Sequence, residues 1–581
     1  MKHYEIDVIR HSLAHILAMA ILKHDPDAKL GTGPATDDGF FYDVLLSDGK
    51  TLTPEDFDGI VADMRAIVKE NLSFVRKSVT TDEARERFTN NPFKLEIIDE
   101  ADARGEEITV YETGTFVDLC VGPHIETTGD IDPDAFVLKG LAGAYWRGNE
   151  TNPMLVRVSG FGFATKEDLD AHLALLEEAK KRDHRKLGRE LGLFTISPLV
   201  GAGLPMMQPK GMVIRQEIEE LLWNLHRDKG YSRVWTPHIA KEDLYTASGH
   251  AVKFGDELFR VTGKEEKFIM KPMNCPHHMQ IFSDNRFSYR DMPVRYFEPA
   301  TVYRDEKSGQ LGGLTRVRAI TQDDGHLFCR VSQIQDEVST IVDIIRKFYT
   351  VFGMMDGYWV SLSVRGADKE NYLGSDDAWA AAEKALDRAA MENGLNYRRI
   401  EGEAAFYGPK LDFMFKDAIG REWQLATIQC DFNLPERFDL SFVNEQGEAE
   451  RPVVIHRAIS GSLERFMGIM IEHYAGAFPF WLSPEQVRVL PIGESERPFS
   501  DKVLSALKAA DIRVSLDSSD ESLGKKIRNA KMGKIPYLVV IGKREAENGT
   551  VTLECRDHGK IGELSIDDLV TRLVKENDPL G

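Results

Sequence analysis

The chain has 581 residues, of which 42% are hydrophobic and 29% are charged, and its formal net charge is −21. This length is too great for one hydrophobic core, and no apolar run reaches the ~20 residues that span a bilayer, so we expect several domains and no membrane segment. An odd number of scattered cysteines and a polar N-terminus without the apolar core of a signal peptide favour the cytoplasm over a secreted disulfide framework.

The first 162 residues mix short β-rich runs with two helical patterns. Strands are expected at 40–42, 108–111 and 156–158, and helices at 7–22 and 54–70, the second with Thr53 as its N-cap. A long charged helix over about 166–191 is then expected to link this part to the next. The sequence therefore predicts a mixed α+β domain at 1–162 and a linker helix at 163–192.

The largest unit is expected at 193–483. It opens with a helix over 212–229, which Gly230 ends, and a strand-like run over 231–234 follows. Helices and strands then alternate irregularly without a βαβ period, which favours an antiparallel sheet. Residues 484–581 alternate regularly instead, with strands at 487–492, 512–516 and 535–541 and helices at 502–509 and 522–530, so a small α/β domain is predicted there.

The segment 303–326, YRDEKSGQLGGLTRVRAITQDDGH, carries the strongest chemical pattern. Arg304 and Glu306 follow a strand-like run, a Gly-rich turn comes next, and Arg316 begins a second basic run. A guanidinium that can hold a phosphate bidentately, with a carboxylate two residues on, suits a nucleotide whose α-phosphate is attacked. Taken alone, the segment could equally be a salt-bridged β-hairpin.

Two further patterns lie near the N-terminus. His11 and His15 are spaced so that both rings share one face of a helix, and Cys120 and His124 form a CxxxH pair. Two such pairs together have the composition of a four-ligand zinc site.

Three separated segments together resemble the motifs of class II aminoacyl-tRNA synthetases. They are GYSRVWTP at 230–237, the 303–326 segment, and GSLERF at 461–466, and the QDDGH ending of the second resembles the threonyl-tRNA synthetase family. The resemblance implies an antiparallel class II catalytic domain, a dimer interface at the first motif, and a nucleotide site in the other two.

The resemblance also implies roles for single residues: Arg304 binds the α-phosphate and the amino-acid carboxylate, Glu306 the adenine amine, and Arg465 the γ-phosphate. Further ATP contacts are expected from Arg316 and Gln424, with Mg²⁺ accompanying ATP. Without the other motifs, Arg465 would be read as a helix-surface residue paired with Glu464 or Asp439.

The resemblance also implies one catalytic Zn²⁺ per subunit, held by Cys275, His326 and His456. A local cluster of Cys275, His277 and His278 is the competing metal site. Three protein ligands leave a coordination position open, which threonine could fill with its amine and hydroxyl and valine could not. In the family Asp324 accepts the hydrogen bond of the substrate hydroxyl. The other expected threonine-binding residues are Met273, Gln322, Tyr407, Lys410 and Gln429.

Serine lacks only a methyl group, which gives about 1–3 kcal/mol of discrimination, so a second hydrolytic site is expected. Residues 1–162 resemble the editing domain that threonyl- and alanyl-tRNA synthetases share. The alanyl relatives bind zinc with the two His/Cys pairs, whereas the threonyl relatives form a metal-free pocket, which we expect here. The implied editing residues are His11, His15, Lys94, Asp118, Cys120 and His124.

The last domain resembles the anticodon-binding domain of the threonyl, prolyl, histidyl and glycyl synthetases. Glu545 matches a family anticodon position, Glu554 stands where Arg is expected, and Arg556 is the candidate to compensate. The early position of His11 also predicts a form without the N-terminal ubiquitin-like module of many bacterial relatives.

The sequence therefore predicts an α+β multidomain threonine–tRNA ligase with editing of seryl-tRNA(Thr), whose partners are tRNA(Thr), ATP, L-threonine and a second copy of the chain. A catalytically silent RNA-binding relative is the alternative from another class. The predicted zinc ligands and Asp324 argue against proline specificity, and the fused editing domain argues against serine specificity.

Overall fold

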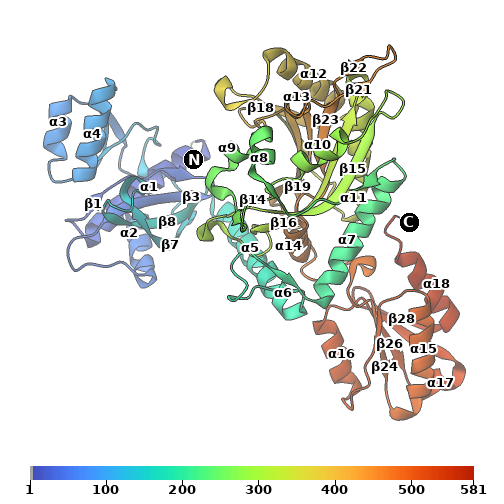
Figure 1. Cartoon of the computed structure of the whole chain (residues 1–581). Helices are drawn as coiled ribbons and strands as arrows, with labels where there is room; N and C mark the ends of the chain where they lie inside the picture. Colours follow the sequence, from blue (N-terminus) through green and yellow to red (C-terminus); the bar gives the residue numbers. More distant parts are fainter. Residues whose placement is uncertain (1–3, 581) are drawn as a thin grey trace. The chain divides into compact units, whose positions relative to one another are not determined.

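The computed structural model describes residues 4–580, which form two compact units that divide between Glu178 and Ala179 (Figure 1). Within these residues, no helix is long and apolar enough to cross a membrane.

The first unit is built on a five-stranded antiparallel sheet. Its strand order is β1-β3-β8-β7, with β2 on β3, and α1 (Ile6–His24) and α2 (Phe57–Lys69) share its core. The strands are β1 (Lys29–Leu30), β2 (Ala35–Thr36), β3 (Gly39–Leu45), β7 (Phe136–Tyr145) and β8 (Met154–Gly162). As predicted, Thr53 begins the second helical segment: its backbone N–H and hydroxyl bond the Asp56 carboxylate, in a 3₁₀ turn that leads into α2.

A smaller layer of the same unit carries Lys94, on its second helix, and Cys120, directly after its last strand. A three-stranded sheet of order β4-β5-β6 is formed by Val75–Ser78, Thr109–Thr113 and Phe116–Leu119. Helices α3 (Thr81–Arg87) and α4 (Pro92–Arg104) pack on it through a separate core that includes Ala84, Ile98 and Val110.

The predicted single linker helix is wrong, because the segment forms two helices. α5 (Lys166–Arg182) ends before Asp183, and α6 (His184–Leu191) begins after it. The Asp183 carboxylate accepts a hydrogen bond of 2.8 Å from the backbone N–H of Arg185, so this residue caps α6 instead of continuing α5.

The second unit contains an eight-stranded sheet of order β11-β15-β16-β23-β20-β19-β17-β18. All its pairs are antiparallel except β11–β15 and β17–β18, which confirms the predicted antiparallel catalytic sheet. Its strands are β11 (Ser232–Arg233), β15 (Val294–Tyr303), β16 (Ala319–Cys329), β17 (Trp359–Val364), β18 (Tyr397–Glu401), β19 (Lys410–Lys416), β20 (Glu422–Asp431) and β23 (Val453–Ala458).

Four long helices bury apolar faces against this sheet: α7 (Pro209–Arg227), α11 (Ile334–Val351), α12 (Asp376–Glu392) and α14 (Leu463–His473). Gly230, just after α7, has φ +77°, the left-handed conformation predicted for it. The smaller elements are α8 (Glu242–Ser248), α9 (His250–Phe254), α10 (Cys275–Ser283), α13 (Asn433–Arg437), β9 (Phe194–Thr195), β10 (Met206–Met207), β12 (Ile239–Lys241), β13 (Arg260–Thr262), β14 (Lys267–Met270), β21 (Phe442–Val443) and β22 (Ala449–Glu450).

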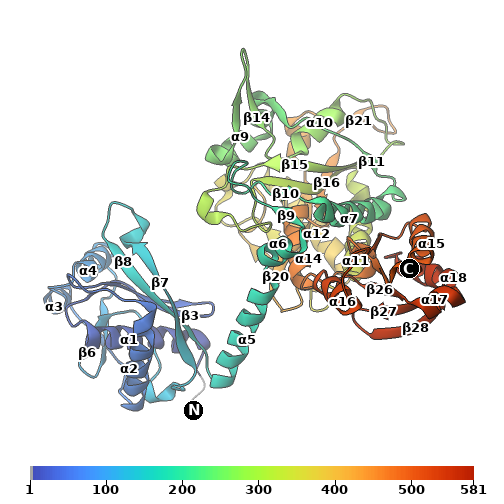
Figure 2. The same cartoon turned by 90° about the horizontal axis from the view of Figure 1, so that it is seen from below.

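The C-terminal part, coloured orange-red to red in Figure 2, is the predicted α/β domain. Its sheet has the order β25-β24-β26-β27-β28. Helices α15 (Arg497–Ala509) and α18 (Ile566–Glu576) cover one face of the sheet and α16 (Leu523–Met532) covers the other. Its remaining elements are α17 (Lys543–Asn548), β24 (Val487–Pro491), β25 (Val514–Leu516), β26 (Tyr537–Ile541), β27 (Thr550–Cys555) and β28 (Gly559–Ser565).

Candidate active site

The register of the large sheet brings distant predicted residues together. His326 on β16 lies directly opposite His456 on β23, which in turn lies opposite Gln429 on β20. Gln429 lies opposite Lys410 on β19. Directly opposed residues of an antiparallel pair have Cβ atoms about 4.5–5.5 Å apart, so these four side chains form one row across four strands.

Cys275, His326 and His456 form a buried cluster in which one ligand atom of each lies within 4.8 Å of the others. Their exposed fractions are 1%, 0% and 4%. Neither His326 Nε2 nor His456 Nδ1 has a hydrogen-bond partner. Burial raises the pKa of the Cys275 thiol well above its usual value and lowers the pKa of His326 well below it. The two ring nitrogens without partners and the Cys275 sulfur fit a metal cation, because a metal binds neutral imidazole and takes a cysteine as thiolate.

The competing local cluster does not form among the described residues. His277 and His278 are absent from the group of ligand atoms around Cys275. Both ring nitrogens of His278 are engaged elsewhere, with His326 and with Glu298.

Three of the predicted threonine-binding side chains lie near this cluster: Asp324 is 4.0 Å from His326, the Tyr407 ring is 5.1 Å from that of His456, and Gln429 lies opposite His456. Asp324 Oδ2 accepts a hydrogen bond of 2.9 Å from the Asn274 amide, and the Tyr407 hydroxyl donates to Gln429 Oε1 at 2.7 Å. Met273 Sδ accepts from Arg304 Nη2 at 3.3 Å.

Gln322 and Lys410 have different surroundings. Gln322 forms a β-bridge to Ser462 and so lies beside the third motif. Lys410 Nζ pairs with Asp412 at 2.5 Å, and Lys410 does not line the cavity that contains Arg304 and Arg465.

A cavity of about 560 Å³ contains the predicted nucleotide residues. Arg304, Glu306, Arg316, Gln322, Gln424 and Arg465 all line it. Among the described residues, neither Arg304 nor Arg465 has an acidic partner, and the Nε of each is buried without an acceptor. Burial lowers the pKa of both guanidiniums. Aromatic rings lie near them instead, Phe254 at 5.0 Å from Arg304 and Trp423 at 5.5 Å from Arg465. Two guanidiniums that form no ion pair suit the binding of an anion in this cavity.

The loop between β15 and β16 is held at both ends. Glu306 Oε2 accepts hydrogen bonds of 2.9 and 2.7 Å from Arg316, and the backbone N–H of Leu314 donates to His184 Nε2 at 3.0 Å. The other ring nitrogen of His184 bonds Glu472 of α14 at 2.7 Å. Asp183, His184 and Glu472 could hold a metal by proximity, but these bonds occupy both His184 nitrogens, so His184 anchors the loop. This role of His184 was not predicted from the sequence, because the only local signal beside it is Asp183, a residue type that favours helix N-caps.

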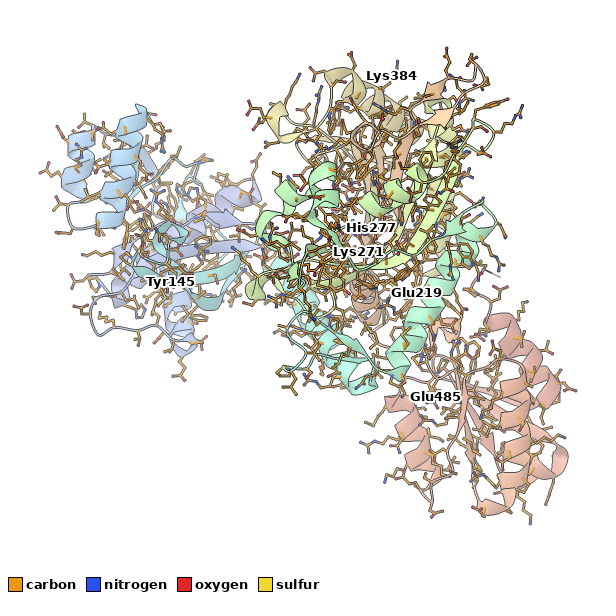
Figure 3. All side chains as sticks on the ribbon, in the orientation of Figure 1. Tyr145, Glu219, Lys271, His277, Lys384 and Glu485 are labelled. Carbon is orange, nitrogen blue, oxygen red and sulfur yellow. The ribbon has the colours of Figure 1, made fainter. Side chains whose placement is uncertain are left out.

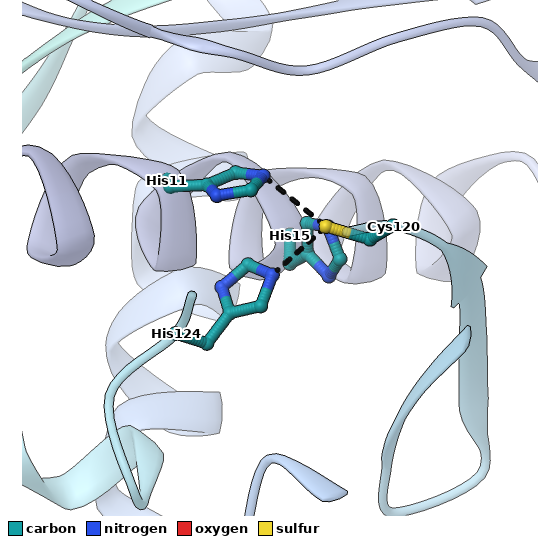
Figure 4. A group of neighbouring side chains, drawn as sticks. All are labelled: His11, His15, Cys120 and His124. Carbon is teal, nitrogen blue, oxygen red and sulfur yellow. Dashed lines mark hydrogen bonds between the residues drawn. The ribbon is translucent and has the colours of Figure 1, made fainter. Parts of the chain in front are cut away.

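The predicted editing residues also come together, in the first unit (Figure 4). Cys120 Sγ lies 3.3 Å from both His11 Nε2 and His124 Nε2, and His15 Nε2 lies 3.5 Å from Asp118. One ligand atom from each of His11, His15, Cys120 and His124 lies within 4.8 Å of the others. Burial lowers the pKa of all three histidines and raises the pKa of Cys120 to about 11.

A buried ion pair adjoins this group. Lys94 Nζ lies 2.5 Å from Asp118 Oδ1, and the Tyr42 hydroxyl bonds the other Asp118 oxygen. Lys94 also donates to the Tyr42 hydroxyl at 3.2 Å. All three residues line a cavity of about 400 Å³ together with His11, His15 and Cys120. Tyr42 was not predicted; its apolar neighbours in the sequence made it look like an ordinary strand core residue.

The two candidate anticodon residues have structural partners. Glu545 caps α17 through the Gly542 N–H at 3.1 Å. Arg556 donates to the carbonyls of Phe478 and Lys534 and pairs with Asp557. The prediction of anticodon contacts gains no support from these bonds.

Three segments match described protein families. Residues 108–159 match the threonyl and alanyl tRNA synthetase second additional domain, 259–474 the tRNA synthetase class II core domain (G, H, P, S and T), and 486–576 an anticodon binding domain.

Full-length relatives match nearly the whole chain. The threonine–tRNA ligase of Gloeobacter violaceus is 48% identical over 97% of this chain and 91% of its own, and that of Thermotoga sp. (strain RQ2) is 44% identical over 98% and 87%. A crystal structure titled as the RNA binding domain of threonyl-tRNA synthetase from Cryptosporidium parvum superposes with a TM-score of 0.65 at 38% identity, covering 68% of this chain and 98% of that one. With the editing-type domain, the class II core and the anticodon-binding domain in this order, the chain belongs to the threonine–tRNA ligase family.

Proposed function

We propose that this chain activates L-threonine with ATP in the cavity beside Cys275, His326 and His456 and transfers it to tRNA(Thr). One observation carries the assignment of the site: two guanidiniums without an ion pair line one cavity, and Arg304 of this pair also bonds Met273, two residues before Cys275 in the cluster whose pair of buried imidazole nitrogens lacks partners. The first pair suits a nucleotide and the second a metal that binds the amino acid.

Activation is an attack of the threonine carboxylate on the α-phosphate, which needs positioning and charge neutralisation and no general base. Arg304 neutralises the α-phosphate and the carboxylate, and Arg465 the γ-phosphate. Glu306 accepts from the adenine amine, with Arg316 and Gln424 completing the nucleotide site. Mg²⁺ enters with ATP.

Cys275, His326 and His456 hold Zn²⁺, since their donor set and unpartnered nitrogens fit it. When bound, the zinc supplies the coordination that separates threonine, with amine and hydroxyl, from valine. Asp324 accepts the hydroxyl hydrogen of threonine, and Met273, Gln322, Tyr407, Lys410 and Gln429 shape the pocket. Cys275→Ser should lose zinc and threonine activation together; a wild-type zinc content in this variant would contradict the assignment.

The second cavity edits seryl-tRNA(Thr) without a metal. His11 and the Lys94–Asp118 pair orient the water that attacks the ester, His15 and Cys120 line the pocket, and His124 contacts Cys120. His11→Ala should keep threonine activation and lose deacylation of seryl-tRNA(Thr). Unchanged deacylation, or an activity that zinc restores after chelation, would count against metal-free editing.

A homodimer forms through the segment at 230–237. Trp235 beside the edge strand β11 is 73% exposed and Ile239 is 41% exposed, so a partner surface would cover apolar area there. Trp235→Asp should shift the protein towards monomer in analytical ultracentrifugation, whereas Trp359→Asp, at the far end of the sheet, should not. The cytoplasm, where tRNA is charged, stays the predicted compartment, and 1–162, 163–192, 193–483 and 484–581 stay the proposed domains.

The decisive experiment is ATP–pyrophosphate exchange with threonine, serine, valine and proline, before and after zinc removal. Strong exchange with threonine, weaker exchange with serine, none with valine, and loss on chelation are expected. A folded, zinc-loaded protein without exchange for any amino acid would favour the silent RNA-binding alternative.

A further inference from the structure

Behind the Cys275–His326–His456 cluster, a chain of buried polar groups runs from His326 into the protein. His326 Nδ1 lies 2.7 Å from His278 Nδ1, and His278 Nε2 lies 2.9 Å from Glu298 Oε2. The exposed fractions of His326, His278 and Glu298 are 0%, 0% and 3%. No water-exposed group interrupts the chain, so the hydrogen positions along it depend on these three residues.

The carboxylate at the end of the chain is held as an anion. Glu298 accepts from the Thr236 N–H at 2.7 Å and from the Thr236 hydroxyl at 3.0 Å. Lys271, labelled in Figure 3, has its Nζ 3.7 Å from Glu298 Oε1. Burial raises the pKa of Glu298, but the hydrogen bond from His278 and the charge of Lys271 bring it below its usual value. An ionised carboxylate can only accept hydrogen bonds.

The position of each hydrogen follows from this anion. Because Glu298 accepts, His278 Nε2 carries a hydrogen, and in an imidazole with a single N–H the other nitrogen, here Nδ1, is an acceptor. The facing Nδ1 of His326 must therefore carry the hydrogen in their 2.7 Å contact. That leaves a lone pair on His326 Nε2, the buried atom without a partner in the ligand cluster. In the opposite tautomer an N–H would occupy the position of a metal ligand.

The local structure supports the same arrangement. Cys275 and His278 are three residues apart on α10, so one helical turn carries both a ligand and the partner of another ligand. His456 is supported more directly, because its Nε2 lies 2.9 Å from Asp431 Oδ2. Each ligand histidine thus has a carboxylate behind it, one in direct contact and one through a second histidine.

We propose that His278 and Glu298 are positioning residues, which fix the tautomer and ring orientation of His326 and thereby set the metal affinity of the Cys275–His326–His456 site. This inference rests on the proposed zinc site and adds the residues that hold one of its ligands ready. Sequence spacing gives no sign of it, since Glu298 belongs to β15 and His278 to α10.

The test is the zinc affinity of purified full-length variants, measured by competition with a chromogenic chelator. Glu298→Gln should weaken zinc binding by about 10–100-fold, the usual effect of removing an outer partner of a ligand histidine. Glu337→Gln is the matched control: Glu337 is also 3% exposed and pairs with Arg295 of β15, but it has no bond to the cluster. Its zinc affinity should stay at the wild-type value.

A second pair of variants separates the hydrogen-bond role from packing. In His278→Asn the side-chain oxygen can take the place of Nδ1 and accept from His326, whereas His278→Leu offers no acceptor. The Asn variant should keep most of the zinc affinity that the Leu variant loses. Equal losses in the two, or a wild-type affinity in Glu298→Gln, would overturn the proposal. Wild-type protein that binds no zinc would instead contradict the zinc site itself.

Discussion

Arg465 allows the sharpest test of the anion site, because its guanidinium has no acidic partner among residues 4–580. Burial lowers its pKa, which means that the free protein holds this charge at a cost. Arg465→Gln removes that cost from the free protein and removes a phosphate contact from the ATP-bound protein. The substitution should therefore stabilise the free protein but weaken ATP binding, and these two effects can be measured separately.

The magnitude follows from the contacts that the guanidinium can make. A hydrogen bond to a charged group contributes about 1.5–3 kcal/mol, so the two bonds of a bidentate phosphate contact contribute about 3–6 kcal/mol in all. We therefore expect kcat/KM for ATP to fall about 10²–10⁴-fold in pyrophosphate exchange. The melting temperature without ligand should stay the same or rise.

Arg457→Gln is the matched control, since Arg457 is a buried arginine that does have a partner. Its Nη1 donates to the Asp323 carbonyl at 2.6 Å and lies 3.5 Å from the Asp323 carboxylate. Breaking a buried pair costs about 3–5 kcal/mol, so this variant should melt earlier. If Arg465→Gln lowered the melting temperature as Arg457→Gln does and left the KM for ATP unchanged, the reasoning would be refuted.

Three further predictions concern other parts of the chain. His184→Phe removes the acceptor of the Leu314 N–H and should raise the KM for ATP about tenfold but not that for threonine; equal effects on both would contradict the anchor. Burial lowers the pKa of His226, so near pH 6.5 only the unfolded state takes up a proton on this ring. The free energy of unfolding should therefore fall by about 1.4 kcal/mol for each pH unit below 6.5, and calorimetry should show a shallower fall in His226→Phe. Leu13→Ala, in the editing core, should cost about 2–5 kcal/mol and lower the melting of that unit while pyrophosphate exchange persists.

Local patterns predicted the elements well where several signals agree. β15 ends at Tyr303, directly before Arg304, as the motif required, and the irregular alternation correctly indicated an antiparallel sheet. The linker failed because charge and periodicity continue through Asp183, and only its side-chain cap breaks the helix. A cap competes with the next helical hydrogen bond, and periodicity cannot register that competition.

The candidate sites depend on strand register, which local patterns do not contain. His326 and His456 face each other because β16 pairs with β23 at one particular offset, and a shift of one residue would turn either side chain to the other face. Resemblance to a family supplied these positions, but it did not supply Glu298 or His278. Their role arises from contacts between a strand and a helix, which become visible only when the fold is known.

Hydrogen-bond satisfaction distinguishes the cluster around His184 from the two predicted ligand sites. Around His184 every ring nitrogen has a partner, so the apparent metal cluster with Glu472 is structural. In the anion cavity Arg304 and Arg465 lack counter-ions, and His326 retains a bare nitrogen although it is fully buried. Leaving such groups unpaired costs stability, and a fold tolerates that cost where a ligand later offsets it. Buried atoms without partners also occur elsewhere, for example on Tyr245 and Arg497, so it is the combination of unpaired groups at 304, 326 and 465 with the predicted motifs that marks the ligand-binding region.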